Sequence, residues 1–448
     1  MAWGLTRAIR LGIAITAIAC FHPLTESHAL PSYARQTGQN CVACHAGGQF
    51  PELSPFGRFF KLTGYTIGTR AVPLSVMGLV SNSRLQNTTN DGVVTDFPKD
   101  RQNILQFASV FYGAKFTDNV GAFIQYTYNN YDHQDANGKW RGLWASDNAD
   151  IRWADHWVDE KRDLIVGATL NNNPTVQDVW NSAPAWSYPY LSSAFAITPA
   201  AAPLISSLGA QVAGIGAYAL WNRTIYGELT GYRTANGIWS LFSHGIPDAA
   251  QTKVNNVAPY WRFAWTKDWG ANSLMLGTTG LRARVYPDPL LPSGPTNRFN
   301  DIGVDAQYQY ILDPHAISAQ ISMMREKVDW AQTLVGNGVD NGSDTLRQYK
   351  VRASYVYRAK YGGNLTWFST TGSTDVSLYQ GLDASNISGN PASRGWSAEV
   401  FWHPVQYARV GAQFLRYDKF NGASTNYDGA GRDAKHNNLL FLYVWFTY

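Results

Sequence analysis

The chain has 448 residues and a formal net charge of +4, with 15% charged and 14% aromatic residues, among them 17 Trp and 25 Tyr. Soluble helical proteins of this length carry more charged and fewer aromatic residues, so the composition favours strands and turns. The small, dispersed charge gives no electrostatic reason to expect a nucleic-acid partner, and we expect none.

The first 29 residues are predicted to be a removable signal peptide. Two arginines precede a short apolar run at 11–21, and Ser27-His28-Ala29 is a small-x-small cleavage site. The apolar run is too short to span a bilayer. An alternative cleavage before Cys20 would give a lipidated mature chain, because residues 17–20 resemble a lipoprotein cleavage box.

Residues 41–45 read CVACH, a Cys-x-x-Cys-His motif typical of covalent c-type haem attachment. Two thiols three positions apart can each add to one vinyl group of a porphyrin, and the adjacent imidazole becomes the proximal iron ligand. We therefore predict one covalently bound haem c, held by Cys41 and Cys44 and ligated by His45. The alternatives are a redox disulfide, which would sit in a βαβ pattern, and a zinc site, which would need a second pair of cysteines.

Residues 30–70 are predicted to form a monohaem cytochrome c module. A Ser-Pro start and aromatic residues at helical spacing predict one short helix over 54–62. Arg35, Arg58 and Lys61 are candidates for contacts with the haem propionates, with solvated surface charge as the alternative. Because about forty residues cannot build an independent core, the rest of the chain is expected to complete this module.

From residue 71 to 448, apolar and polar residues alternate in sixteen runs. This pattern predicts a mainly β fold, a transmembrane antiparallel β-barrel of about sixteen strands with the haem module lodged in or at its lumen. The runs lie at 72–86, 102–116, 120–131, 148–159, 163–171, 209–221, 224–234, 257–267, 272–284, 300–311, 316–329, 345–358, 363–375, 394–403, 406–419 and 436–448.

The connections and the last run predict an outer-membrane barrel. Each short turn joins an even-numbered run to the next odd one, as in barrels whose two ends lie in the periplasm. The last run ends at Tyr448 with apolar residues at every second position before it, which resembles the insertion signal of bacterial outer-membrane barrels. A soluble β-sandwich or propeller is the alternative, although its strands would average about five or six residues.

The long connections are rich in Asn, Asp, Gly, Ser, Pro and Thr, so they are predicted to be surface loops. They lie at 86–100, 132–147, 172–208, 234–256, 286–298, 330–344, 375–394 and 419–435.

The haem module contains no Met or second His to occupy the sixth position of the iron. A distal ligand must therefore come from the barrel, or the position is open to water. Side-chain parity places Met77 and His156 in the lumen near the periplasmic strand ends. Either residue is a candidate distal ligand.

The N-terminal residues resemble the fused cytochrome–porins that act as outer-membrane iron(II) oxidases in iron-oxidising bacteria. The resemblance rests on ARQTG at 34–38, CVACH at 41–45 and PELSPFGRFFKLTGYT at 51–66, and on the fusion of one haem module to a barrel. It implies Cys41 and Cys44 as attachment points and His45 as proximal ligand. It further implies iron(II) as donor at the cell surface, a periplasmic electron-carrier protein as acceptor, and a barrel surrounded by outer-membrane lipid.

Two other functions fit the same sequence. In the first, the barrel is a porin for small solutes and the haem module is its plug or gate. In the second, the protein is an outward conduit that delivers electrons to external acceptors. One haem cannot span a membrane of about 30 Å, so any electron-transfer function requires a donor on one side and an acceptor on the other.

Overall fold

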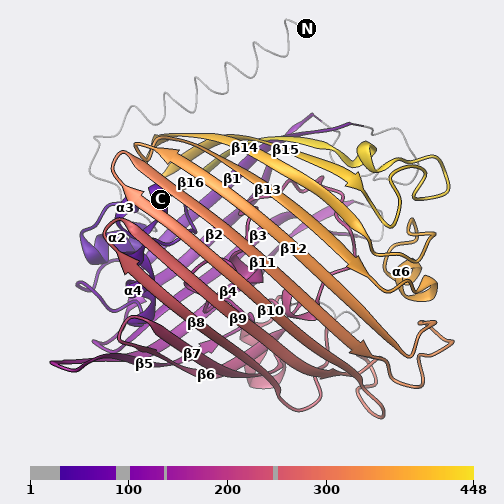
Figure 1. The fold of residues 1–448 in the computed structure, drawn as a ribbon, viewed down its shortest axis with the longest axis horizontal. Coiled ribbons are helices and arrows are strands. Elements are labelled where there is room, and N and C mark those ends of the chain that lie inside the picture. The colour runs from indigo at the N-terminus through magenta and orange to yellow at the C-terminus, as the bar shows by residue number, and fades with distance from the viewer. Residues whose placement is uncertain (1–30, 87–100, 136–138, 246–250) are drawn as a thin grey trace, which may run out of the picture.

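The computed structural model describes residues 31–86, 101–135, 139–245 and 251–448. Sixteen antiparallel strands close into one barrel in which β1 pairs with both β2 and β16 (Figure 1). This confirms the predicted sixteen-stranded fold. The predicted signal peptide and residues 87–100 lie outside the described residues.

The strands follow the predicted runs in order. They are β1 Leu74–Leu85, β2 Asn103–Lys115, β3 Val120–Gln134, β4 Trp140–Asp159, β5 Arg162–Asn171, β6 Val212–Trp221, β7 Ile225–Thr234, β8 Ala258–Trp269, β9 Asn272–Val285, β10 Asn297–Leu312, β11 His315–Asp329, β12 Ser343–Tyr357, β13 Tyr361–Gly372, β14 Ser393–Val405, β15 Ala408–Lys419 and β16 Leu439–Thr447.

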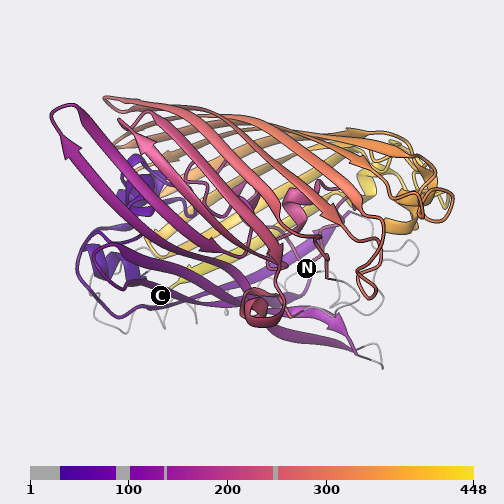
Figure 2. The same ribbon diagram turned by 90° about the horizontal axis from the view of Figure 1, so that it is seen from below.

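One predicted loop is largely strand. The segment 132–147 was expected to be a surface loop, but β3 continues to Gln134 and β4 begins at Trp140. The hairpin is held beyond the predicted boundary by an ion pair of 2.7 Å between Arg141 and Asp135. Figure 2 shows this hairpin projecting past the barrel rim. The polar composition of this segment predicts a loop, although its residues pair across two strands.

The two faces of the barrel wall differ in polarity. Outward-facing residues are apolar and exposed, for example Ile215 (61%), Leu229 (65%) and Val400 (66%). Inward-facing residues include fully buried charged groups such as Arg152 and Arg262. A soluble protein buries its apolar residues instead, so the polarity is that of a barrel with an apolar surrounding.

The N-terminal module lies at the end of the barrel where the short turns are, close to the C-terminus (Figure 1). Its helices are α2 Pro31–Thr37, α3 Cys41–Cys44, η1 Ala46–Gly48 and α4 Pro55–Leu62. The Ser54 side chain caps α4 by accepting a hydrogen bond from the Gly57 amide, and Pro55 occupies the first turn, which confirms the predicted helix. None of the described helices is long and apolar enough to cross a membrane.

The segment 172–208 folds into the lumen, so its prediction as a surface loop was wrong. Trp180 and Tyr188 in this segment are at most 2% exposed. The Trp180 carbonyl accepts a hydrogen bond from the Gln320 amide on β11, at 3.2 Å. Polar side chains of the wall form hydrogen bonds with this aromatic-rich segment. The segment therefore packs inside, although its composition is that of a loop. We call 172–208 the inward loop.

Short helices complete the described loops. They are η2 Pro184–Trp186 and α5 Leu204–Ser207 in the inward loop, and η3 Gly237–Phe242, α6 Val376–Leu382 and η4 Ala434–Asn437 elsewhere.

Candidate functional site

Helix α3, which carries both cysteines, is held tightly against α4. The Ser54 amide donates a hydrogen bond of 2.9 Å to the Cys44 carbonyl. A Cβ atom on Gly57 would lie 2.0 Å from the same carbonyl oxygen, so only glycine allows this approach. The capping serine and the small residue therefore position the Cys-x-x-Cys-His segment.

The module is joined to the barrel rather than free-standing, as expected from its size. The Tyr33 hydroxyl donates a hydrogen bond of 2.6 Å to the Ala122 carbonyl of β3. Glu52 forms an ion pair with Arg352 of β12. Leu62 belongs to an apolar cluster with Ile165 of β5. The barrel wall thus supplies the core that the module lacks.

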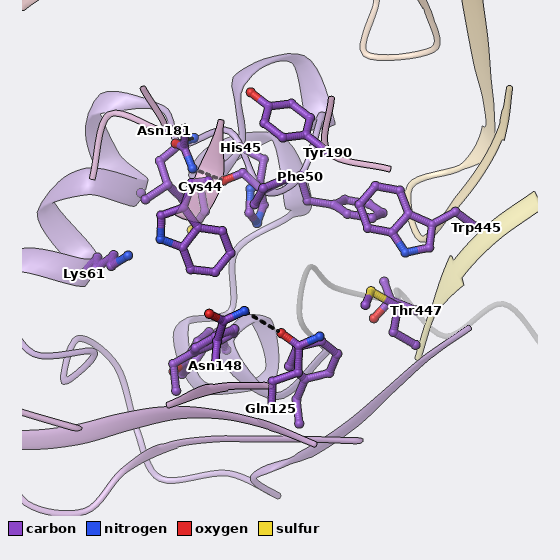
Figure 3. Close-up of a pocket in the computed structure, with 18 of the residues that line it drawn as sticks. Cys44, His45, Phe50, Lys61, Gln125, Asn148, Asn181, Tyr190, Trp445 and Thr447 are labelled. Atoms are coloured by element: carbon purple, nitrogen blue, oxygen red, sulfur yellow. Dashed lines mark hydrogen bonds between the residues drawn. The ribbon is translucent and has the colours of Figure 1, made fainter. Parts of the chain in front are cut away.

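A cavity of about 480 Å³ lies between this module, the inward loop and the wall formed by β1–β4 and β16. Figure 3 shows Cys44, His45 and Lys61 on one side of this cavity, with the adjacent rings of Phe50 and Trp445 beside them. Its volume falls in the range of about 300–1,000 Å³ that is usual for small-molecule and cofactor sites. The cavity is therefore large enough to consider a bound prosthetic group.

The motif residues have the chemistry that haem attachment needs. Cys41 and Cys44 are free thiols. Burial raises the pKa of Cys44 to about 11, so it is protonated at neutral pH. His45 is buried and its Nδ1 has no hydrogen-bond partner among the described residues. Burial lowers the pKa of His45 to about 4, so the imidazole is neutral, which is the form that ligates a metal.

These residues fit a c-type haem. Two unlinked thiols lie on one helical turn, and Cys44 and His45 both line an aromatic cavity. Cys41 and Cys44 would hold the group, and His45 would ligate its iron.

The three predicted propionate contacts lie in different places. Arg35 is exposed and donates to the carbonyl of Leu74 at 2.5 Å. Arg58 is buried and donates to Gln309 and Ser273, each at 2.6 Å. Neither arginine lines the cavity, whereas Lys61 does.

Lys61 is held by the inward loop. Its Nζ donates to the carbonyls of Val176 and Asp178, at 2.6 and 3.1 Å, and lies 5.0 Å from the centre of the Trp186 ring. Burial lowers the pKa of Lys61 to about 7. The Lys61 amine is therefore only partly protonated at neutral pH, and an anion in the cavity would favour its charged form.

The two predicted distal ligands are separated by the structure. Met77 of β1 lines the same cavity as His45 and pairs across the strands with Thr447. His156 of β4 does not line this cavity. Its Nε2 lies 2.7 Å from Asp163 Oδ1, and its ring contacts Phe59 at 5.4 Å between centres. The structure therefore brings Met77, and not His156, into the cavity of the motif.

Sequence reasoning missed the contribution of the inward loop to this site. Asn181 accepts a hydrogen bond of 2.9 Å from the Leu53 amide, and the Tyr190 hydroxyl donates to Glu52 at 3.0 Å. The signal that could have revealed it is the density of Trp and Tyr between 180 and 190, which is unusual for a solvent-exposed loop.

Within the described part of the chain, no group of three or more His, Cys, Asp or Glu side chains is placed to hold a metal ion.

Comparisons with known proteins find similar barrels and no sequence relatives. No protein-family model matches the chain, and no curated protein matches its sequence. Solved structures that align over most of its length include OmpF of Salmonella typhi in complex with daunomycin (TM-score 0.48, 11% identity, 84% of this chain and 97% of that chain). The outer membrane channel DcaP of Acinetobacter baumannii aligns with a TM-score of 0.44 and 11% identity, over 84% of this chain and 96% of that chain. An anion-selective porin from Comamonas acidovorans aligns with a TM-score of 0.44 and 12% identity, over 85% of this chain and 100% of that chain.

Proposed function

We propose that this protein is an outer-membrane cytochrome–porin that takes electrons from iron(II) at the cell surface and delivers them to a periplasmic electron carrier. The observation that carries the proposal is the cavity inside the barrel that Cys44, His45 and Met77 line together. The resemblance of residues 34–66 to cytochrome–porins supplies iron(II) as the donor.

The wall of the barrel supports a membrane location. Its outward-facing strand residues are apolar and its inward-facing residues are polar, which is the pattern required by lipid outside and a polar lumen inside. The module lies at the short-turn end, which supports a periplasmic position for it in a barrel of this kind. An electron carrier in the periplasm would then approach the module directly.

A c-type haem, when bound, supplies reversible one-electron exchange. The chain's own residues prepare its site. Cys41 and Cys44 provide the thiols for attachment, and the close contact of Gly57 with the Cys44 carbonyl holds helix α3 in place. His45 would present a neutral imidazole, and Met77 of β1 lines the same cavity. The rings of Phe50 and Trp445, 4.3 Å apart between centres, exclude water from one side.

A porin for small solutes is the second candidate function. A further cavity of about 340 Å³ lies between the inward loop and the wall strands β9–β16, and it is lined by many Ser and Thr hydroxyls. Ser187, Pro189 and Ser192 line both cavities, so the inward loop forms the partition between them. If the protein is a porin, this loop narrows a solute pathway, and if it transfers electrons, the loop closes that pathway.

Two measurements separate these functions. Pyridine haemochrome analysis of the purified protein is expected to give one covalent haem per chain, and none in the Cys41→Ser/Cys44→Ser variant. Proteoliposomes are then expected to be impermeable to small sugars, yet to reduce an enclosed electron-carrier protein when iron(II) is added outside. Sugar permeation without covalent haem would establish the porin and reject the proposal. Electron flow only from inside to outside would establish the outward conduit.

A further inference from the structure

Four arginines on the described barrel strands are almost completely buried, each at most 2% exposed. Three of them have carboxylate partners: Arg152 pairs with Asp150, Arg262 with Asp178 and Asp305, and Arg352 with Glu52. The fourth, Arg409 of β15, forms no ion pair with any described carboxylate. Arg409 therefore has no direct counterion, and its charge is offset only by more distant groups.

The surroundings of Arg409 are aromatic. Its guanidinium carbon lies 4.2 Å from the centre of the Phe401 ring and 5.4 Å from that of Trp445. Its Nε donates a hydrogen bond of 3.2 Å to His403 Nε2, while its Nη2 has no hydrogen-bond partner among the described residues. Arginine stays protonated in proteins, so the rings surround a full positive charge.

Arg409 lies one aromatic ring away from the proximal histidine. Phe50 contacts both residues, since its ring centre is 6.1 Å from that of His45 and 5.8 Å from the Arg409 guanidinium carbon. Phe50 and Trp445 line the cavity, whereas Arg409 contacts both rings and does not line it. The charge is therefore close to the iron-ligand side of the cavity but does not contact its contents.

We infer that Arg409 tunes the redox potential of this site: its fixed charge raises the midpoint potential of a haem held by Cys41, Cys44 and His45. The inference rests on the proposed function. An oxidised iron centre carries one more positive charge than a reduced one, so a fixed cation nearby disfavours the oxidised state. Packed rings screen this field poorly, because they exclude water and have a low dielectric constant. A raised potential would suit a protein that takes electrons from iron(II).

The test is a potentiometric titration of the purified, haem-containing full-length protein. Arg409→Gln is expected to shift the midpoint potential to a more negative value, and Arg409→Lys is expected to retain the wild-type value because it retains the charge. Arg358→Gln is the matched control. Arg358 lies in the turn between β12 and β13 at the same end of the barrel but is exposed to solvent, so its removal is expected to leave the potential unchanged.

Glu399→Gln provides a second variant if Arg409→Gln does not insert. Glu399 is a buried carboxylate on the neighbouring strand β14 that accepts a hydrogen bond from Tyr443. Neutralising it leaves the positive charge of Arg409 less compensated, so the potential is expected to rise. An unchanged potential in either neutralised variant overturns the inference, as does an Arg409→Lys protein that behaves like Arg409→Gln. Absence of covalent haem in the wild type would instead reject the proposed function, and the inference with it.

Discussion

Glu52 and Arg352 form a buried ion pair that joins the N-terminal module to the barrel wall across 300 positions of sequence. Tyr190 of the inward loop also donates to Glu52, so three separate parts of the chain meet at one carboxylate. The position of the module therefore depends on the folded barrel and on the loop inside it.

The first prediction concerns this pair. Glu52→Gln keeps the shape of the side chain but leaves the Arg352 charge unpaired, which is expected to lower the free energy of unfolding by about 3–5 kcal/mol. Asp159→Asn is the control, because the Asp159–Arg162 pair is about half exposed and solvent screens it, so its loss is expected to change stability far less. Urea unfolding followed by tryptophan fluorescence measures both. Equal effects would show that Glu52 does not anchor the module.

A second prediction tests the approach of α4 to α3. Gly57→Ala places a methyl group against the Cys44 carbonyl, where the available distance is 2.0 Å. The helices must separate, so we expect a loss of about 1–3 kcal/mol in stability and a lower yield of covalent haem. Gly381→Ala in α6 has open space around the new Cβ and serves as the control for both measurements. Normal haem yield in Gly57→Ala would contradict the proposed packing role.

A third prediction distinguishes the two candidate distal ligands. Met77→Ala is expected to change the visible spectrum and lower the midpoint potential, because Met77 lines the cavity and a thioether ligand raises the potential of a haem. His156→Gln is expected to change neither, because His156 pairs with Asp163 outside the cavity. If Met77→Ala leaves the spectrum and potential unchanged, the assignment of Met77 is wrong.

The fourth prediction is a pH dependence. Burial lowers the pKa of Lys61 from 10.5 to about 7, so the folded chain releases this proton several pH units before the unfolded chain does. The unfolded state therefore binds more protons between these values, and stability is expected to rise with pH there, by at most about 1.4 kcal/mol per pH unit. The difference in unfolding free energy between the wild type and Lys61→Met isolates this contribution. A difference that is constant from pH 7 to 10 would rule it out.

The strands were predictable because alternation is a local property. In β14, for example, Val400 is exposed on the outer face while Ser397 and Glu399 are buried on the inner face, and this alternation follows a period of two. The Cys-x-x-Cys-His motif was equally local, because its five residues are consecutive. Parity also identified Met77 as a lumen residue, which its place on the cavity wall confirms.

Contacts between segments that are distant in the chain could not be predicted from the sequence alone. Arg58 appeared to be a propionate partner, yet Gln309 and Ser273, more than 200 positions away, accept its hydrogen bonds. Trp180 belongs to a segment with the composition of a surface loop, and only the polar wall opposite explains its burial. The place of Arg409 beside Phe50 depends on how the barrel closes around the module.

The most direct test of the central claim is a reduced-minus-oxidised absorption spectrum of the purified protein mixed anaerobically with iron(II). We expect the haem bands of the oxidised protein to convert to those of the reduced form at a pH where iron(II) is soluble, in proportion to one electron per chain. A haem that stays oxidised in excess iron(II) would contradict iron(II) oxidation as the function of this barrel.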